Sequence, residues 1–154
     1  NIVQPDVSVF GQKDIQQAVS IEKMVADLNF PVRIIIAPTV REDDGLAMSS
    51  RNKRLSPDER QRSVAISRAL KRAEELMRSG ERSVRAITIA MINIINESNP
   101  KKIDYISVVR YRDLDLVDTI TEKSVIAAAV FYGETRLIDN MIVEPDGGAV
   151  RCIY

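Results

Sequence analysis

The sequence DVSVFGQKDIQQAVSIEKMVADLNFPVRIII, residues 6–36, contains the clearest alternation of strand and helix patterns in the chain. Its β-branched segments at residues 6–10 and 32–36 predict two strands. Apolar residues recur at helical spacing across residues 14–29, between these strands, and Pro31 stops the predicted helix. A strand, a helix and a strand in this order predict a βαβ unit with parallel strands. Because both strands carry few polar residues, we expect helices on both faces of the sheet, and an α/β fold class.

A polar segment, residues 38–55, follows the second strand and is longer than most connections, which favours a functional role. The sequence SPDE at residues 56–59 predicts a capped helix start, and the apolar stripe that follows continues to Gly80. Ser83 predicts the cap of another helix, which runs to about Ser98.

The last third of the chain predicts three strands, at residues 103–109, 124–131 and 135–143. A tight turn at residues 133–134 makes the last two an antiparallel pair.

These elements predict two domains and a tail. Residues 1–39 form the end of a parallel α/β domain, and residues 40–143 form a small α+β domain with two helices and a three-stranded antiparallel sheet. Residues 144–154 form a disordered or loosely packed tail, in which Cys152 has no expected role.

The composition excludes several classes of function. The 22 basic and 22 acidic residues cancel, so long-range attraction to nucleic acid or to an anionic membrane is not indicated. No apolar run approaches the roughly 20 residues that span a bilayer. No signal peptide is recognised, and the single cysteine agrees with a reducing cytoplasm. The sequence contains no histidine, which removes the commonest general base and any histidine metal site.

The first candidate site follows the first strand. Gly11 permits close backbone approach, Lys13 can reach a phosphate or a carboxylate, and Asp14 can cap the helix or accept ribose hydroxyls. Gln16 and Gln17 lie in the first helical turn and can face the same cleft. A surface lysine beside a routine aspartate cap is the alternative explanation.

The second candidate site is the segment Met48-Ser49-Ser50-Arg51. Its serines offer hydroxyl and backbone donors, and the planar guanidinium of Arg51 suits phosphate oxygens. A flexible loop of this kind can close over a triphosphate and stabilise charge on a pyrophosphate leaving group. The alternative is a polar loop before a helix. The basic residues from 51 to 85 are expected to form a solvated helix face rather than a nucleic-acid surface, because no aromatic residues interleave with them.

Together these motifs resemble the pantothenate synthetase (pantoate–β-alanine ligase) family. The resemblance rests on VFGQKDIQQ at residues 9–17, PTVRE at 38–42, GLAMSSRN at 45–52 and TRLIDN at 135–140, and it extends from about residue 1 to residue 143. It implies a Rossmann-like nucleotidyl-transferase sheet followed by the small domain. It also implies an ATP-dependent ligase, with Mg²⁺ assistance, that joins pantoate and β-alanine through a pantoyl-adenylate intermediate.

The resemblance also implies roles for individual residues. Gln17 would bind pantoate, and Val40 would contact adenine through its backbone. The expected catalytic residues are Lys13, Ser49, Ser50 and Arg51. The expected ATP-binding residues are Gly11, Gln12, Lys13, Asp14, Val40, Met48, Ser49, Ser50 and Arg51. The TRLIDN string is expected to be structural.

The chain departs from the family pattern in one large respect. The histidine-containing signature of the family is missing, as are the other pantoate contacts and the carboxylate expected to bind magnesium, and the sequence does not begin with methionine. We therefore expect the carboxyl-terminal half of a homodimeric cytoplasmic enzyme, with no metal ligands of its own and with little or no activity alone. The alternatives are a non-catalytic dimerisation or interaction domain and a different adenylate-forming enzyme.

Overall fold

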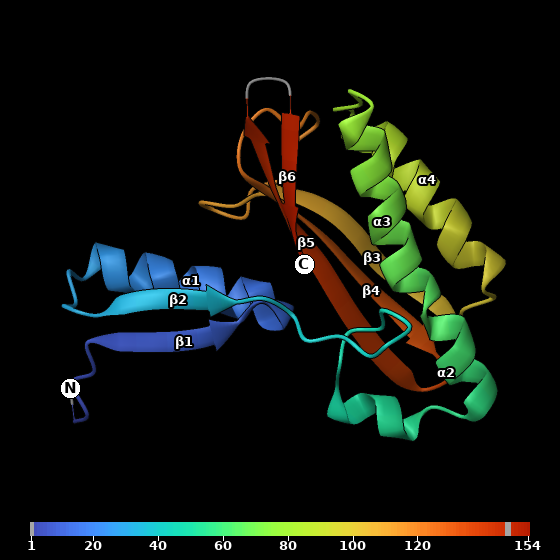
Figure 1. Cartoon of the computed structure of the whole chain (residues 1–154), viewed down its shortest axis with the longest axis horizontal. Helices are drawn as coiled ribbons and strands as arrows, with labels where there is room; N and C mark the ends of the chain where they lie inside the picture. Colours follow the sequence, from blue (N-terminus) through green and yellow to red (C-terminus); the bar gives the residue numbers. More distant parts are fainter. Residues whose placement is uncertain (1, 147–148) are drawn as a thin grey trace.

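The computed structural model describes residues 2–146 and 149–154. The chain begins with β1 (Val7–Gly11), a 3₁₀ turn η1 (Gln12–Asp14), α1 (Ile15–Asp27) and β2 (Arg33–Ala37). Strands β1 and β2 pair in parallel, with Val9 opposite Ile35, so the predicted βαβ unit is confirmed (Figure 1).

Only one face of this two-stranded sheet is covered by the residues that the structure describes. Phe10 and Ile34 point toward α1, where they line an apolar groove of about 610 Å³ with Ile21. On the opposite face the side chains of Val9 and Ile35 are 63% and 39% exposed. The expectation of helices on both faces is therefore wrong within the described chain, because no second helix packs against β1 and β2.

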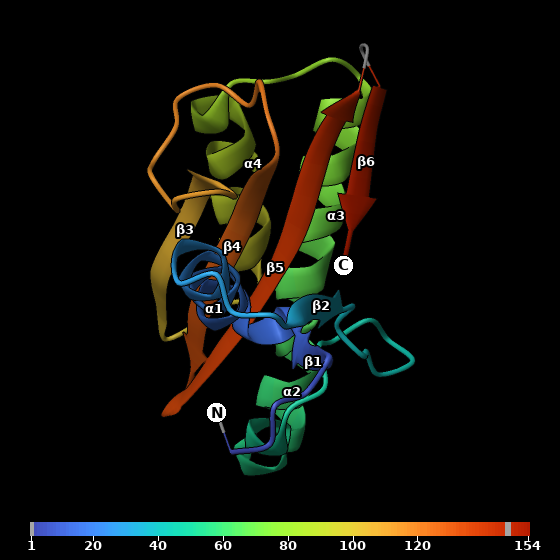
Figure 2. The same ribbon diagram turned by 90° about the vertical axis from the view of Figure 1, so that its left-hand side faces the viewer.

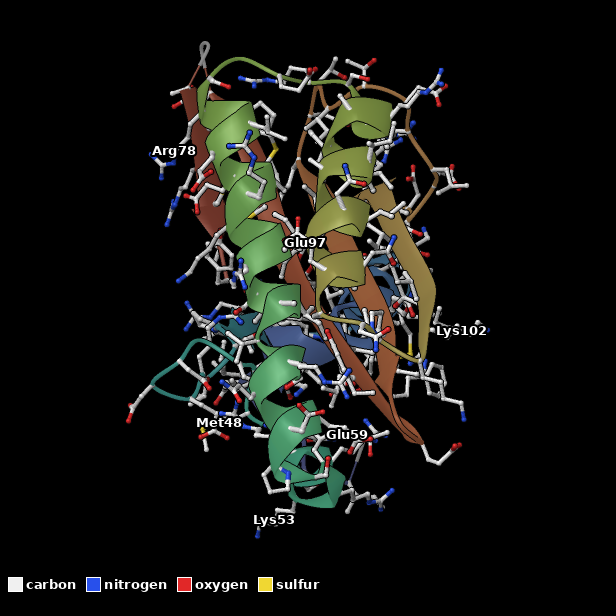
Figure 3. The ribbon with its side chains drawn as sticks, turned by 90° about the vertical axis from the view of Figure 1, so that its right-hand side faces the viewer. Met48, Lys53, Glu59, Arg78, Glu97 and Lys102 are labelled. Carbon is white, nitrogen blue, oxygen red and sulfur yellow. The ribbon has the colours of Figure 1, made fainter. Side chains whose placement is uncertain are left out.

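The second sheet is antiparallel and has the order β3–β4–β5–β6. Its strands are β3 (Lys102–Arg110), β4 (Ser124–Tyr132), β5 (Thr135–Asp146) and β6 (Ala149–Ile153). This sheet lies between two helical layers (Figure 2). The helices α3 (Ala65–Arg78) and α4 (Val84–Glu97) cover one face side by side, and α1 covers part of the other (Figure 3).

The fourth strand corrects the predicted three-stranded sheet and part of the predicted loose tail. Strand β5 continues to Asp146, and β6 pairs with it, so that Cys152 lies opposite Val143. Burial is the main cause that raises the pKa of the Cys152 thiol to about 11. Residues 147 and 148 of the predicted tail lie outside the described residues.

The predicted long helix after Ser56 is two helices. The capping box of Ser56 and Glu59 is present and starts α2 (Pro57–Ser63), and Val64 separates α2 from α3. The buried hydroxyl of Ser63 donates to the carbonyl of Arg60 at 2.8 Å, a local bond that competes with regular helical pairing. Ser83 caps α4 as predicted, by accepting a hydrogen bond from the Ala86 amide.

The main core lies between the large sheet and the α3–α4 layer. Ile87, Met91 and Ile95 of α4 are fully buried against β3 and β4 residues such as Val108 and Ile126. Among the described residues, no helix combines the length and apolar character that a membrane span requires.

This packing predicts different costs for the same substitution at two sites of α4. Ile87 is 0% exposed and Ile89 is 49% exposed. Ile87→Ala should lower the free energy of unfolding by about 2–5 kcal/mol, because it removes buried methyl groups and leaves a cavity. The matched control Ile89→Ala should change it by less than about 1 kcal/mol. Urea unfolding measures both, and equal losses would contradict this assignment of the buried face of α4.

Candidate functional site

The two candidate loops meet in the structure. We call residues 11–14 the lysine turn and residues 48–51 the arginine loop. The ammonium of Lys13 donates to the carbonyl of Met48 at 2.7 Å and to the carbonyl of Ala47 at 3.4 Å. These contacts bring the lysine turn directly against the start of the arginine loop, as the sequence motifs predict.

A short hairpin, residues 41–47, sets the position of the two carbonyls. Arg41 and Ala47 form an antiparallel bridge at its base. The amide of Glu42 donates to the Leu46 carbonyl, and the amide of Gly45 donates to the Glu42 carbonyl, both at 2.8 Å. Gly45 has a φ of +92°, a conformation that glycine adopts without steric cost. The hairpin therefore presents a fixed backbone edge to the lysine.

The arginine loop leaves its phosphate-binding groups accessible. Ser49 caps the 3₁₀ turn η2 (Ser50–Arg54) by accepting a hydrogen bond from the Arg51 amide at 3.2 Å. Ser50 and Arg51 are exposed, and no described residue forms an ion pair with the Arg51 guanidinium. A cation held on a capped turn without a partner is available to an anionic ligand.

The electrostatics of Lys13 also favour an anion. Burial of the half-exposed ammonium is the main cause that lowers the pKa of Lys13. The carboxylates of Asp139 and Asp14 act to raise this pKa, whereas the charges of Arg51 and Arg41 lower it. Arg51 therefore lies close enough for its positive charge to act on the Lys13 ammonium. A phosphate between the two cations would relieve their repulsion and replace lost solvation.

Two polar atoms in this region remain unused. The Thr39 hydroxyl and the Asn52 side-chain oxygen are buried and have no hydrogen-bond partner among the described residues. The Asn52 amide group donates to the Ala47 carbonyl at 3.2 Å, so Asn52 is oriented beside the acceptors of Lys13. Buried polar atoms of this kind are usually satisfied by protein, water or ligand.

The other predicted site residues lie in or next to these two loops, and they differ in how far they are exposed to solvent. Gly11 is open, since nothing lies within 4 Å of a Cβ built there. Asp14 is exposed and occupies the cap position of α1, but its side chain accepts no hydrogen bond from the helix, so of its two possible roles the side-chain cap is absent. Val40 is 67% exposed, and its carbonyl accepts from the Met48 amide at 2.9 Å. Gln17 is exposed and lines a hollow of about 240 Å³ together with Lys13.

Gln12 lies differently from the other residues of the lysine turn. It is 1% exposed, and its amide donates to the Ile153 carbonyl at 2.8 Å and to the Asn140 side-chain oxygen at 3.3 Å. The side chain therefore joins the lysine turn to β5 and β6, and mainly its backbone is left for a ligand.

One cluster of interacting side chains at this site was not predicted from the sequence. The guanidinium of Arg41 donates to both carboxylate oxygens of Asp139, at 2.7 and 2.9 Å, and to the Gly45 carbonyl at 2.9 Å. It also lies 5.2 Å from the ring centre of Tyr154. Both charged residues belong to quoted motifs, but no local pattern in the sequence pairs them.

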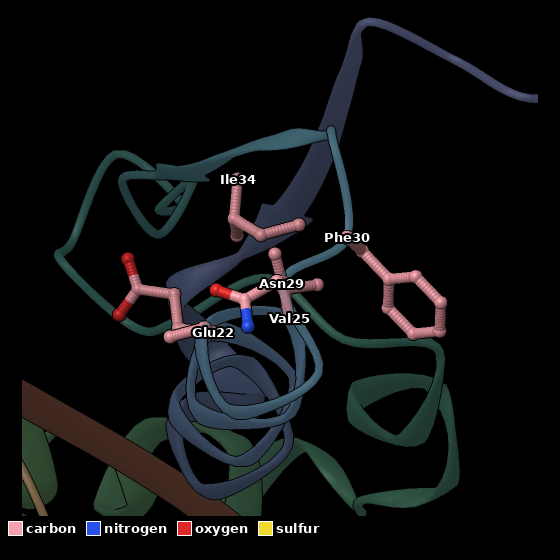
Figure 4. A pocket seen from close by; sticks show the side chains of 6 residues that line it. Glu22, Val25, Asn29, Phe30 and Ile34 are labelled. Atoms are coloured by element: carbon pink, nitrogen blue, oxygen red, sulfur yellow. The ribbon is translucent and has the colours of Figure 1, made fainter.

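A separate hollow of about 530 Å³ lies between α1 and β2, where Glu22, Asn29, Phe30 and Ile34 line it (Figure 4). Its lining includes no cationic side chain and carries the carboxylate of Glu22, which disfavours a phosphate there. Within residues 2–146 and 149–154, no group of three or more histidine, cysteine, aspartate or glutamate side chains is arranged to hold a metal ion.

Comparison with known proteins identifies the family of the chain. A family model described as pantoate-beta-alanine ligase matches residues 1–142. The pantothenate synthetase of Syntrophomonas wolfei is 52% identical over 144 residues, which cover 94% of this chain and 51% of that protein. The pantothenate synthetase of Thermoanaerobacter sp. is 50% identical over 142 residues, which cover 92% of this chain and 50% of that one.

Solved structures of proteins of this family also match the chain. The pantothenate synthetase of Thermus thermophilus matches with a TM-score of 0.83 at 37% identity, covering 90% of this chain and 50% of that one. The enzyme of Francisella tularensis, solved as a complex with beta-gamma ATP and beta-alanine, matches with a TM-score of 0.60 at 29% identity, covering 90% and 44%. The chain spans about half the length of the relatives that it matches. On these grounds the chain belongs to the pantoate-beta-alanine ligase family.

Proposed function

We propose that this chain supplies the phosphate-binding part of an ATP-dependent ligase that joins pantoate and β-alanine. In the first step the pantoate carboxylate attacks the α-phosphorus of ATP, which forms pantoyl adenylate and releases pyrophosphate. In the second step the amine of β-alanine attacks the acyl carbon and displaces AMP. Adenylation is needed because AMP leaves readily from an acyl carbon, whereas oxide does not.

The observation that carries this proposal is the contact of Lys13 with the Met48 carbonyl, next to an Arg51 that forms no ion pair with any described residue. The two loops that carry these cations lie against each other, which suits a ligand with several negative charges. Catalysis of both steps then depends on positioning and on neutralising phosphate charge.

Each residue has a role in this proposal. Lys13 and Arg51 would bind the polyphosphate, and the hydroxyls and amides of Ser49 and Ser50 would bind its remaining oxygens. Because Lys13 donates to the Met48 carbonyl in the free chain, ATP would draw the ammonium away from it, and the arginine loop would move as it closes.

The remaining contacts would select the substrates. The exposed carboxylate of Asp14 would accept ribose hydroxyls. The backbone of Val40 would meet adenine, with Gly11, Gln12 and Met48 alongside. Gln17 would bind pantoate through its amide, from its place in the hollow that Lys13 also lines.

Magnesium would arrive with the nucleotide. Mg²⁺ prefers oxygen ligands and is often held by substrate phosphates plus one or two carboxylates. We expect those ligands mainly from ATP and from the part of the relatives that this chain does not span. The ion would neutralise the charge of the pyrophosphate that leaves.

We place this reaction in the cytoplasm, an expectation that the single cysteine supports. A homodimer is the expected assembly.

A second candidate function is a non-catalytic dimerisation domain. It is favoured by the uncovered apolar face of the β1–β2 sheet, where Val7, Val9 and Ile35 are 37%, 63% and 39% exposed. An apolar surface of this kind is commonly an interaction site. Sedimentation with and without nucleotide separates the two functions, since a dimer that binds no nucleotide would favour the second.

Nucleotide titration tests the proposal directly. A non-hydrolysable ATP analogue with Mg²⁺ should bind the chain saturably in calorimetry. Lys13→Ala and Arg51→Ala should each weaken binding by about 10-fold or more, because each removes a charge-assisted hydrogen bond. The matched controls are Lys23→Ala on exposed α1 and Arg54→Ala on the same 3₁₀ turn as Arg51, and both should stay within about twofold. Absence of binding, or equal losses in the controls, would count against the proposed site.

Turnover tests whether the site is complete. Because the sequence contains no histidine and spans about half of its relatives, we expect little or no pantothenate from the chain with ATP, pantoate and β-alanine. Chromatography of the products measures this. A rate within the ordinary enzymatic range of about 1 s⁻¹ or more would refute the incomplete site.

A further inference from the structure

We propose that Asp139 and Asn140 are the positioning residues of the phosphate site, because they hold the hairpin and the lysine turn from opposite faces of β5. The inference rests on the proposed function for its ligand, and it assigns a task to a motif that the sequence marked only as structural.

The two residues are neighbours on β5 and point to opposite faces of the sheet. Asp139 pairs with Ala128 and Asn140 pairs with Ala127 on β4. Ala128 belongs to the core under α3 and α4, whereas Ala127 belongs to the cluster under α1. The two side chains therefore leave one strand in opposite directions.

Asp139 holds the hairpin. Its side chain is 2% exposed, and Arg41 engages both of its oxygens. The same guanidinium donates to the Gly45 carbonyl at the hairpin turn, so one buried carboxylate fixes the hairpin at its base and, through Arg41, at its tip. A planar guanidinium meeting a carboxylate in this way fixes orientation as well as distance.

Asn140 holds the lysine turn. Its amide group donates to the carbonyls of Gln12 and Lys13, both at 3.0 Å. Its oxygen accepts from the Gln12 side chain at 3.3 Å, and its backbone amide donates to Asp139 at 2.8 Å. Both hydrogens of the amide group are thus used to fix the backbone on either side of the lysine.

The hairpin and the lysine turn are thus both anchored on the same strand, β5. Strand β6 pairs with β5 only at residues 142–146, so the segment around Asp139 and Asn140 carries no β6 neighbour among the described residues. The lysine turn and the segment that leads from β2 into the hairpin both contact the end of β6: the Gln12 side chain donates to the Ile153 carbonyl, and the Thr39 amide donates to the Tyr154 carbonyl at 3.1 Å. The separation of Lys13 from Met48 is therefore set by one strand.

A purely structural role makes a different prediction. If the two residues only stabilise the fold, their loss weakens the whole domain evenly. If they position the site, the loops loosen while the sheet between them stays protected, since local openings cost less than global unfolding.

The experiment uses isosteric variants of the whole chain. Asp139→Asn removes the charge that pairs with Arg41, and Asn140→Asp replaces two donated hydrogens with an acceptor that faces two carbonyls. Asp113→Asn is the matched control, because Asp113 pairs with Arg110 and contacts neither loop. Arg41→Lys is a second probe if Asp139→Asn does not fold, as it keeps the charge and loses the paired geometry.

Hydrogen exchange without ligand gives the first readout. In Asp139→Asn or Arg41→Lys, two amides should exchange at least about 10-fold faster: that of Glu42, bonded to Leu46 across the hairpin, and that of Met48, bonded to Val40 next to the base of the hairpin. Asn140→Asp should accelerate exchange in the lysine turn. The β4 amides should keep wild-type protection in all variants. An even increase across β4 and the loops, or no change in the loops, would overturn the inference.

Affinity gives the second readout. Asp139→Asn and Asn140→Asp should each weaken binding of the non-hydrolysable ATP analogue by about 10-fold, and Asp113→Asn by less than about twofold. Unchanged affinity in folded Asp139→Asn and Asn140→Asp would overturn the inference. If the wild-type chain binds no nucleotide, the proposed function fails. The hydrogen-exchange rates of the amides in the hairpin and the lysine turn still decide whether Asp139 and Asn140 position these segments.

Discussion

An ammonium that is half removed from water needs acceptors, and Lys13 finds them in the backbone carbonyls of Ala47 and Met48. The rest of the site depends on this contact, because it joins the end of β1 to the loop that carries Arg51. The two loops belong to different parts of the fold, and this contact joins them directly, in addition to the anchoring of the hairpin and the lysine turn on β5. The lowered pKa of Lys13, caused mainly by burial, indicates that these neutral acceptors only partly replace solvent. An anionic ligand would improve that balance.

The large sheet provides the frame for this contact. Strand β5 is covered by α3 and α4 on one face and by α1 on the other, so it is held more firmly than either loop. The buried pair of Arg41 and Asp139 is weak evidence for stability, since desolvation offsets much of its attraction. The pair instead fixes the orientation of the Arg41 side chain, because the Asp139 carboxylate accepts two hydrogen bonds from one planar guanidinium.

The sequence predicted the elements whose signals are local. Helical spacing, the Ser56 capping box and the turn at residues 133–134 each depend on neighbouring residues, and the structure contains all three. The meeting of Lys13 with the arginine loop followed from the motifs. The pair of Arg41 and Asp139 is separated by 98 positions, and no periodicity reports such a contact. Strand β6 was missed because five residues beside Pro145 and two glycines carry a weak strand signal, and pairing with β5 decides their conformation.

We propose that Lys13 and Arg51 bind one polyphosphate from two sides. A crystal structure of the chain with a non-hydrolysable ATP analogue would show where both side chains lie relative to the ligand. We expect the Lys13 ammonium and the Arg51 guanidinium within about 3.5 Å of oxygens of the same phosphate chain. A nucleotide bound elsewhere, for example in the hollow beside Glu22 and Phe30, or the two cations on unrelated surfaces, would contradict it.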